Sequence, residues 1–217
     1  MLRLVCANLN YSSWSVRPWL ALKHAGLDFR THDVGLRTEQ GWKDRILSFS
    51  GAGKVPVLVD GTLSIHESLA ICEYVAELAP AARLWPADRA LRARGRAISC
   101  EMHAGFSHLR NNMDMNLRAR ARRTPRSPEI DADVARVLDI WHASLTSNGG
   151  PFLLGPDFSI ADCMFFPVVT RFRTYGVELP DFAQAYAAAL FALPIVAELE
   201  KIAATTPPIP EYDKALG

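Results

Sequence analysis

The stretch at residues 54–68 places the strongest constraint on how this chain can fold. Its sequence, KVPVLVDGTLSIHES, predicts a strand, a tight turn, a second strand and the start of a helix. The apolar run at 57–59 suits a buried strand, and Asp60-Gly61 is a common hairpin turn because both residues tolerate positive φ. Residues 69–78 then carry apolar side chains at helical spacing. The stretch therefore predicts an antiparallel hairpin that leads directly into a helix.

Two residue pairs in this stretch suggest a ligand site. Val55-Pro56 precedes the first strand, where a missing N–H does least harm, and an X-Pro bond in such a turn is a candidate for the cis isomer. Glu67-Ser68 falls at the predicted helix N-terminus, where free N–H groups and the positive end of the helix dipole favour a carboxylate. The same pair also suits an ordinary helix cap. Both interpretations stay open at this point.

Length and composition exclude several classes of protein. The chain has 217 residues, of which 49% are hydrophobic, so it can bury a sizeable core in one large or two small domains. A net charge of +1 gives no global reason to expect nucleic acid or an anionic membrane as partner. No apolar run reaches the length of a membrane span, and the N-terminus has no signal-peptide pattern. The four cysteines form no C-x-x-C pair, so we expect no metal site. We expect the cysteine thiols to be buried and reduced, in a cytoplasmic protein.

The first part of the chain alternates between strand and helix patterns. We expect strands at residues 2–9 and 28–34, joined by a helix that begins near residues 13–15 so that a proline falls in its first turn. A short helix is expected within residues 35–49, followed by the hairpin and its helix. The resulting order, β-α-β-α-β-β-α, predicts an α/β domain over residues 1–79.

The remainder of the chain predicts helices only. The proline-containing segment 80–88 is expected to be a linker, and residues 89–217 form a second domain without strand signals. Residues 90–112 carry one continuous helical period. The segment 157–162, DFSIAD, predicts a helix start in which the serine and the last aspartate form a capping box. Residues 205–217 are expected to be a proline-broken tail.

Four of these motifs, in this order and at this spacing, resemble the soluble glutathione S-transferase superfamily. They are the Val-Pro pair before the hairpin, the Glu-Ser pair at the helix start, the capping box, and the turn YSSWSVRP at residues 11–18. The turn is similar to the Ser-Ser-x-x-x-Arg opening of serine-type bacterial, zeta-like and theta-like members. The resemblance implies a thioredoxin-like N-terminal domain followed by an all-helical C-terminal domain.

The resemblance also implies a binding site for glutathione. Glu67 would accept a hydrogen bond from the ammonium of the γ-glutamyl head, and Ser68 would donate to the neighbouring carboxylate. The backbone of Val55 would pair with the cysteinyl backbone in the manner of an added strand. The implied glutathione-binding residues are Lys54, Val55, Pro56, Glu67 and Ser68.

In this superfamily a hydroxyl group stabilises the glutathione thiolate, since a free thiol has a pKa of about 8.5. Counting back five residues from Arg17 selects Ser12 as the donor, whereas the four-residue count of theta-like members selects Ser13. Tyr11 is a third candidate, by analogy with tyrosine-type classes. Ser15 is expected to be the N-cap of the first helix.

The second substrate is expected to meet Trp14, His103, Phe106 and Arg110, and Arg110 could hold an anionic co-substrate. An alternative assigns Phe106 to the core and gives His103 and Arg110 interdomain hydrogen bonds. Trp14 stands where some relatives carry cysteine, which argues against mixed-disulfide chemistry with glutathione.

The resemblance implies a glutathione S-transferase that activates the glutathione thiol for attack on a small electrophile. Two alternatives remain, because a fold does not settle a function: a zeta-like glutathione-dependent cis-trans isomerase, and a non-catalytic binding protein. The family also implies detoxification, a homodimer, a cytoplasmic location and glutathione as co-substrate without a metal. The arginine-rich run at 118–126 is expected to be a solvated loop, not a nucleic-acid or membrane site.

Overall fold

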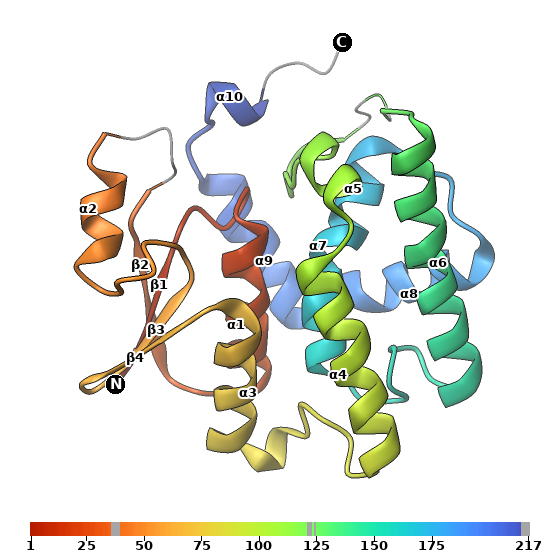
Figure 1. Ribbon diagram of the computed structural model, residues 1–217, viewed down its shortest axis with the longest axis horizontal. Helices are drawn as coiled ribbons and strands as arrows, with labels where there is room; N and C mark the ends of the chain where they lie inside the picture. The colour runs from red at the N-terminus through yellow and green to blue at the C-terminus, as the bar shows by residue number, and fades with distance from the viewer. Residues whose placement is uncertain (36–39, 121–122, 124, 214–217) are drawn as a thin grey trace.

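The computed structural model describes residues 1–35, 40–120, 123 and 125–213, and the statements below concern these residues. A small sheet with its helices forms one side of the molecule, and a bundle of helices forms the other (Figure 1). The part of the arginine-rich run at 121–122 and 124 lies outside the described residues.

The N-terminal half confirms the predicted order β-α-β-α-β-β-α. Its elements are β1 (Leu2–Cys6), α1 (Ser13–His24), β2 (Phe29–Asp33), α2 (Trp42–Leu47), β3 (Val57–Asp60), β4 (Leu63–His66) and α3 (Ser68–Leu78). The strands form one four-stranded sheet in the order β2-β1-β3-β4. β1 runs parallel to β2 and antiparallel to β3, and β3 and β4 form the predicted hairpin. This is the thioredoxin-like arrangement that the resemblance implied.

The alternation of side chains along β1 explains why helices cover both faces of the sheet. Leu4 belongs to the large cluster that includes Val16 of α1, whereas the next residue, Val5, packs with Ile46 of α2. Successive residues of a strand point to opposite faces, so one strand supplies both clusters. Accordingly, α1 and α3 lie on one side of the sheet and α2 on the other (Figure 1).

The hairpin has a two-residue turn, as predicted, but the turn residues are Gly61, with a φ of 57°, and Thr62. Asp60 ends β3 and pairs with Leu63, so the predicted Asp60-Gly61 pair is wrong by one position. The Val55-Pro56 bond directly before it is cis, which confirms that prediction. The hairpin therefore places the cis bond and the start of α3 at the same end of the sheet.

Beyond the 3-10 turn η1 (Pro80–Ala82), the described part of the chain contains helices and no further named strand. These helices are α4 (Arg89–Ala104), α5 (Ser107–Asn112), α6 (Pro128–Asn148), α7 (Ile160–Tyr175), α8 (Asp181–Phe191), α9 (Pro194–Thr205) and α10 (Pro210–Asp213). An all-helical second half is thus confirmed. No single described helix is long and apolar enough to cross a membrane; α8 and α9, which meet at 76°, reach that length and composition only as a pair.

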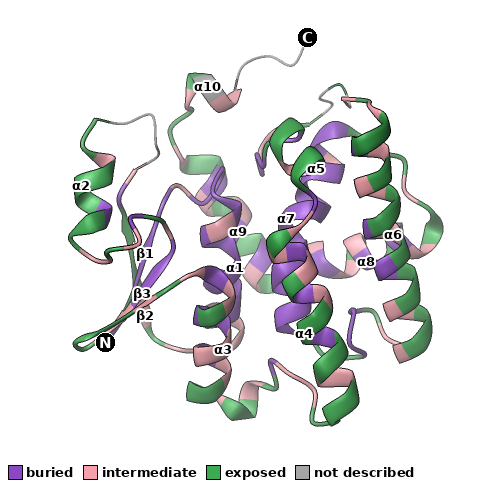
Figure 2. Ribbon diagram, in the orientation of Figure 1, coloured by how far each residue is buried: buried purple, intermediate pink, exposed green. Residues whose placement is uncertain are grey.

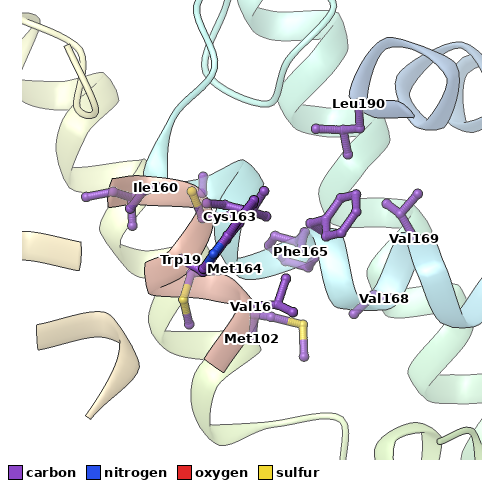
Figure 3. Close-up of a cluster of buried hydrophobic side chains, with 14 of the residues drawn as sticks. Val16, Trp19, Met102, Ile160, Cys163, Met164, Phe165, Val168, Val169 and Leu190 are labelled. Carbon is purple, nitrogen blue, oxygen red and sulfur yellow. The ribbon is translucent and has the colours of Figure 1, made fainter. Parts of the chain in front are cut away.

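Helix α7 is the central helix of this half and is buried along almost its whole length (Figure 2). Figure 3 shows Val16 and Trp19 of α1 and Met102 of α4 in the same cluster as Cys163 and Met164 of α7. Because α1 belongs to the sheet half, this cluster joins the two halves of the molecule through one continuous core.

The predicted capping box is present at the start of α7. Ser159 donates to the Asp162 carboxylate from its backbone N–H at 2.9 Å and from its hydroxyl at 2.7 Å. The same carboxylate accepts from the N–H of Leu153 at 3.0 Å and from the hydroxyl of Tyr186 at 3.1 Å. Burial raises the pKa of Asp162, and these hydrogen bonds oppose the rise. One buried carboxylate therefore holds the helix start, its preceding loop and α8 together.

Two expectations about the helical half are wrong. Residues 90–112 do not form one helix, because α4 ends at Ala104 and Phe106 adopts a left-handed φ of 58°. Cys100 is exposed on α4, unlike the other three cysteines. The proline-broken tail contains one further short helix, α10.

We predict that Asp162→Ala lowers the free energy of unfolding by about 2–4 kcal/mol, because it removes the cap and leaves several buried donors without an acceptor. Asp157→Ala, at the exposed position just before the cap, is the matched control and should cost much less. Urea denaturation of both variants measures the difference. Equal midpoints would contradict the role assigned to Asp162.

Candidate active site

A cavity of about 700 Å³ lies between the sheet half and the helical half. Its wall is formed by the turn after β1, the segment before β3, the start of α3, and residues of α4, α5, α7 and α10. Most of the residues predicted for the site line this cavity: Ser12, Ser13, Trp14, Lys54, Val55, Pro56, Glu67, Ser68, His103 and Arg110. Phe106 is not among them, and it packs in the core at 6% exposure.

Glu67 occupies one end of the cavity and is the N-cap of α3. Its Oε1 accepts from the backbone N–H groups of Leu69 and Ala70, at 2.9 and 3.2 Å. Its Oε2 lies 2.7 Å from Nε2 of His103, which reaches across from the last turn of α4. The carboxylate is therefore a helix cap and also an exposed anion in the cavity wall.

Ser68 supplies an unsatisfied hydroxyl beside this carboxylate. Its side chain is fully buried, and its Oγ has no hydrogen-bond partner among the described residues. A buried polar group without a partner costs about 1–3 kcal/mol, so the structure tolerates it only where something else compensates. Since Ser68 lines the cavity, a ligand oxygen placed there would satisfy its hydroxyl.

The backbone beside the cis bond is also open to a ligand. Val55 lines the cavity just before β3 begins, and no hydrogen bond to its backbone occurs within the described part of the chain. Such a segment can pair with an extended peptide as an added strand would. Lys54 lines the same side of the cavity.

Ser12, not Ser15, is the N-cap of α1, so the expectation for Ser15 is wrong. The two hydroxyl oxygens lie 2.8 Å apart, and the N–H of Ser15 donates to Ser12 Oγ at 3.4 Å. Ser15 is fully buried, and its Oγ accepts from the N–H of Ala7 at 3.1 Å. The sequence pattern indicated Ser15 as the cap because it does not reveal the tight turn that brings Ser12 over the helix start.

The available hydrogen-bond partners indicate how the hydroxyl protons of Ser12 and Ser15 are arranged. Within the described residues, the Ser15 hydroxyl has only Ser12 Oγ as an acceptor. If it donates there, both lone pairs of Ser12 Oγ are occupied by Ser15, and the Ser12 proton is free. Ser12 lines the cavity, so this proton is available to an anion in the cavity.

The hydroxyl of Ser13 has a different partner, because it accepts from Nη2 of Arg171 at 3.3 Å. Arg171 comes from α7, where it is buried and also donates to the carbonyls of Met113 and Pro167, at 2.7 and 3.1 Å. Burial lowers the pKa of Arg171 to about 10. Arg171 thus brings a fixed guanidinium to the serine turn.

The hydroxyl of Tyr11 is fully engaged elsewhere. It donates to Asp213 of α10 and accepts from Arg118 at 2.7 Å and from the N–H of Ile209 at 3.1 Å. Burial, and then the bond to Asp213, raise the pKa of Tyr11. The ring of Tyr212 packs on Tyr11 with a centroid distance of 5.3 Å. Tyr11 therefore anchors the C-terminal segment and has no proton free for a thiol.

Trp14 lies between two guanidinium groups. The Arg17 and Arg110 guanidinium carbons are 4.4 and 4.5 Å from its ring centroid, and the His103 ring meets it edge-on at 5.0 Å. Arg17 is fully buried, and neither of its terminal nitrogens has a hydrogen-bond partner within the described residues. Burial, followed by the charges of Arg110 and Arg171, lowers the pKa of Arg17 to about 9.

Sequence reasoning missed several residues that line the cavity, among them Asn111, Arg171 and Tyr212. Arg171 stands near the end of a mostly apolar helix, and the sequence gives no sign that it faces a ligand. Tyr212 belongs to the segment expected to be a proline-broken tail. No group of described residues is arranged to hold a metal ion.

Comparison with known proteins agrees with this geometry. Residues 11–78 match the family "Glutathione S-transferase, N-terminal domain", and residues 121–192 match "Glutathione S-transferase, C-terminal domain". A probable maleylacetoacetate isomerase from Caenorhabditis elegans is 31% identical over 170 residues, which are 78% of each chain. This chain therefore belongs to the glutathione S-transferase family, and the prediction of a glutathione transferase enzyme is confirmed at the level of the family.

Other similar proteins support the same family and fold. A probable maleylacetoacetate isomerase from Vibrio cholerae is 27% identical and covers 91% of this chain and 95% of its own. A glutathione transferase homolog from Burkholderia, crystallised with bound glutathione, superposes with a TM-score of 0.72 at 22% identity, covering 95% of this chain and 99% of that one. At this identity the structural likeness shows the fold alone.

We predict that Ser15→Ala lowers the free energy of unfolding by about 1–3 kcal/mol, because the buried N–H of Ala7 loses its acceptor. Thermal and urea denaturation measure the loss. Ser64→Ala, on the exposed strand β4, is the matched control and should stay within about 0.5 kcal/mol of the wild type. A Ser15→Ala protein as stable as the control would show that this hydrogen-bond chain carries no stability.

Proposed function

We propose that this protein is a glutathione S-transferase that binds glutathione in the cavity and holds its thiol as a thiolate through Ser12. The observation that carries the proposal is the unpartnered, buried hydroxyl of Ser68 beside Glu67, in the same cavity as the hydroxyl of Ser12. The Ser68 end of the cavity therefore suits a carboxylate, and the Ser12 end suits an anion.

The γ-glutamyl head of glutathione suits the first end. Its ammonium would donate to the Glu67 carboxylate, and its α-carboxylate would accept from the hydroxyl and backbone N–H of Ser68. The cysteinyl backbone would pair with Val55, next to Pro56. Lys54 adds a positive charge on that side, which favours the glycyl carboxylate.

The thiolate would lie at the start of α1. The Ser12 hydroxyl donates to the sulfur, and the positive end of the α1 dipole stabilises the same negative charge. The guanidinium of Arg171, held beside Ser13, adds a positive field. These contacts lower the thiol pKa, so the proton leaves to solvent without a protein base.

For the second substrate we propose the wall made by Trp14 and Arg110, with Arg171 nearby. The indole provides an apolar face, and the guanidinium of Arg110 favours an electrophile that carries an acidic group. Phe106 is not part of the proposed second-substrate site, because it packs in the core. His103 is not part of that site either, because its imidazole is bound to Glu67.

A glutathione-dependent isomerase is the second candidate, because two similar proteins are described as probable maleylacetoacetate isomerases. The same thiolate would add to a double bond and leave again after rotation. Assaying the purified protein with a cis-unsaturated keto acid, with and without glutathione, decides between the two. From family membership alone we also propose a homodimer, a cytoplasmic location and a role in detoxification; sedimentation tests the first.

We predict that Glu67→Ala weakens glutathione binding by about ten- to a hundred-fold, because it removes a charge-assisted contact worth about 1.5–3 kcal/mol. Glu67→Gln keeps an oxygen to cap α3 and should still lose most of the affinity. Glu77→Ala, exposed at the other end of α3, is the matched control. Calorimetry that finds unchanged affinity in a folded Glu67→Gln protein would refute the γ-glutamyl assignment.

We predict that Ser12→Ala raises the thiol pKa of bound glutathione by about one to two units, because it removes a hydrogen bond of about 1.5–3 kcal/mol at 1.36 kcal/mol per unit. The rate with a chlorinated nitrobenzene should drop at pH 6.5 and partly recover at pH 9, where ionisation is no longer limiting. Ser13→Ala, measured in parallel, tests the alternative in which Ser13 is the hydroxyl donor to the thiolate.

Activity that is equal for Ser12→Ala and wild type at every pH would rule out the Ser12 hydroxyl as thiolate donor. If the wild type binds glutathione but no electrophile reacts, the non-catalytic alternative holds. A rise in thiol pKa seen only for Ser13→Ala would transfer the role to Ser13.

A further inference from the structure

His103 is the one histidine in the described residues that contacts the Glu67 carboxylate, and the contact joins the two halves of the molecule. Its Nε2 lies 2.7 Å from Glu67 Oε2. Glu67 stands at the start of α3, and His103 stands in the last turn of α4. The other oxygen of Glu67 is fixed by two backbone N–H groups. The orientation of this carboxylate is therefore set from both halves.

The imidazole is held in one place by its other contacts. Its ring meets Trp14 edge-on at 5.0 Å, and its backbone carbonyl accepts from Nη1 of Arg110 at 3.1 Å. The same Arg110 nitrogen donates to the carbonyl of Gly105, at the break between α4 and α5. This break, which the sequence did not predict, fixes the α4 terminus that carries His103.

Hydrogen-bond accounting places the proton of neutral His103 on Nε2, where it donates to Glu67. Nδ1 is buried and has no partner among the described residues. A second proton would therefore sit on a buried nitrogen without an acceptor, which is unfavourable. The geometry itself favours the neutral imidazole.

The charged groups that face this imidazole come from three helices. Glu67 of α3 favours protonation, and Arg17 of α1 and Arg110 of α5 oppose it. Burial, which is the largest cause, keeps the pKa of His103 below its ordinary value of 6.5. A further cation placed at Glu67 would act in the same direction as the two arginines.

We propose that His103 is a positioning residue of the glutathione site, which orients Glu67 when neutral and competes with the γ-glutamyl ammonium when protonated. The inference rests on the proposed function, because it places that ammonium at Glu67. Glutathione binding and protonation of His103 then exclude each other, so binding in mild acid releases one proton from Nδ1 to the solvent.

The direction of the pH dependence follows from this competition. The ammonium lowers the pKa of His103 in the complex relative to the free protein, because two cations would otherwise share one carboxylate. Affinity is therefore complete above the pKa of the free protein and falls as the pH drops through it. We expect a loss of about three- to ten-fold between pH 7 and pH 5.

The test uses S-methylglutathione and isothermal calorimetry from pH 5 to 7.5, in two buffers of different ionisation enthalpy. This probe keeps the γ-glutamyl head but has no thiol to titrate. The wild type should lose affinity in acid and release up to one proton on binding. His103→Gln, whose amide can still donate to Glu67, should bind within about three-fold of the wild type at pH 7.5 and show no pH dependence.

His66→Gln is the matched control, because His66 is exposed and lines the same cavity. It should keep the wild-type pH dependence. The inference is overturned if the wild type shows no loss in acid, or if His103→Gln retains the wild-type slope. Absence of S-methylglutathione binding at every pH would overturn the proposed function together with this inference.

A second measurement covers the case in which His103→Gln fails to fold. In an NMR titration of the wild type, the pKa of the His103 imidazole should be lower with saturating S-methylglutathione than without it. The signal that shifts should also be present in His66→Gln, which shows that it does not come from His66. An unchanged pKa on saturation would overturn the inference independently of any His103 variant.

Discussion

The buried contact between α1 and α7 is the interaction on which the rest of this structure depends. Arg17 has no exposed surface, and its Nε donates to the carbonyl of Met164 at 3.2 Å. Around it, apolar residues of both helices form one core (Figure 3). The cavity lies between the two halves that this contact joins, so the relative position of its walls depends on the contact. The bonds from Arg171 to Ser13 and from His103 to Glu67 both cross the same boundary.

The same contact brings an excess of positive charge beneath the cavity. Arg17, Arg110 and Arg171 lie close enough for Arg110 to lower the pKa of both others, and burial lowers the pKa of all three. Glu67 is the carboxylate that faces Arg17. Burying a guanidinium is costly unless a negative charge or hydrogen bonds compensate it. In the proposed complex, the thiolate and carboxylates of glutathione would supply that negative charge.

Elements with a local physical cause could be predicted from the sequence, and those with a distant cause could not. The hairpin and the α7 capping box depend on residues a few positions apart, and both were predicted, although the turn residues are Gly61 and Thr62, one position later than expected. The break after α4 was missed because the helical period continues through Gly105, while the stabilising contacts come from Arg110 on the next helix. The short helix α10 within the tail was not predicted, because it is held by Tyr11, about two hundred residues earlier.

The sequence by itself determined the order of the elements, the cap at Glu67 and the neighbouring Ser12 and Ser13, because periodicity, turn chemistry and capping act over a few residues. Only the tertiary structure decided that the Ser12 and Ser15 hydroxyls lie in contact, that Arg171 reaches the serine turn, and that His103 binds Glu67. These outcomes need side chains from helices far apart in the chain to approach within hydrogen-bond distance. That approach is set by how α1, α4 and α7 pack, and no local pattern specifies the packing.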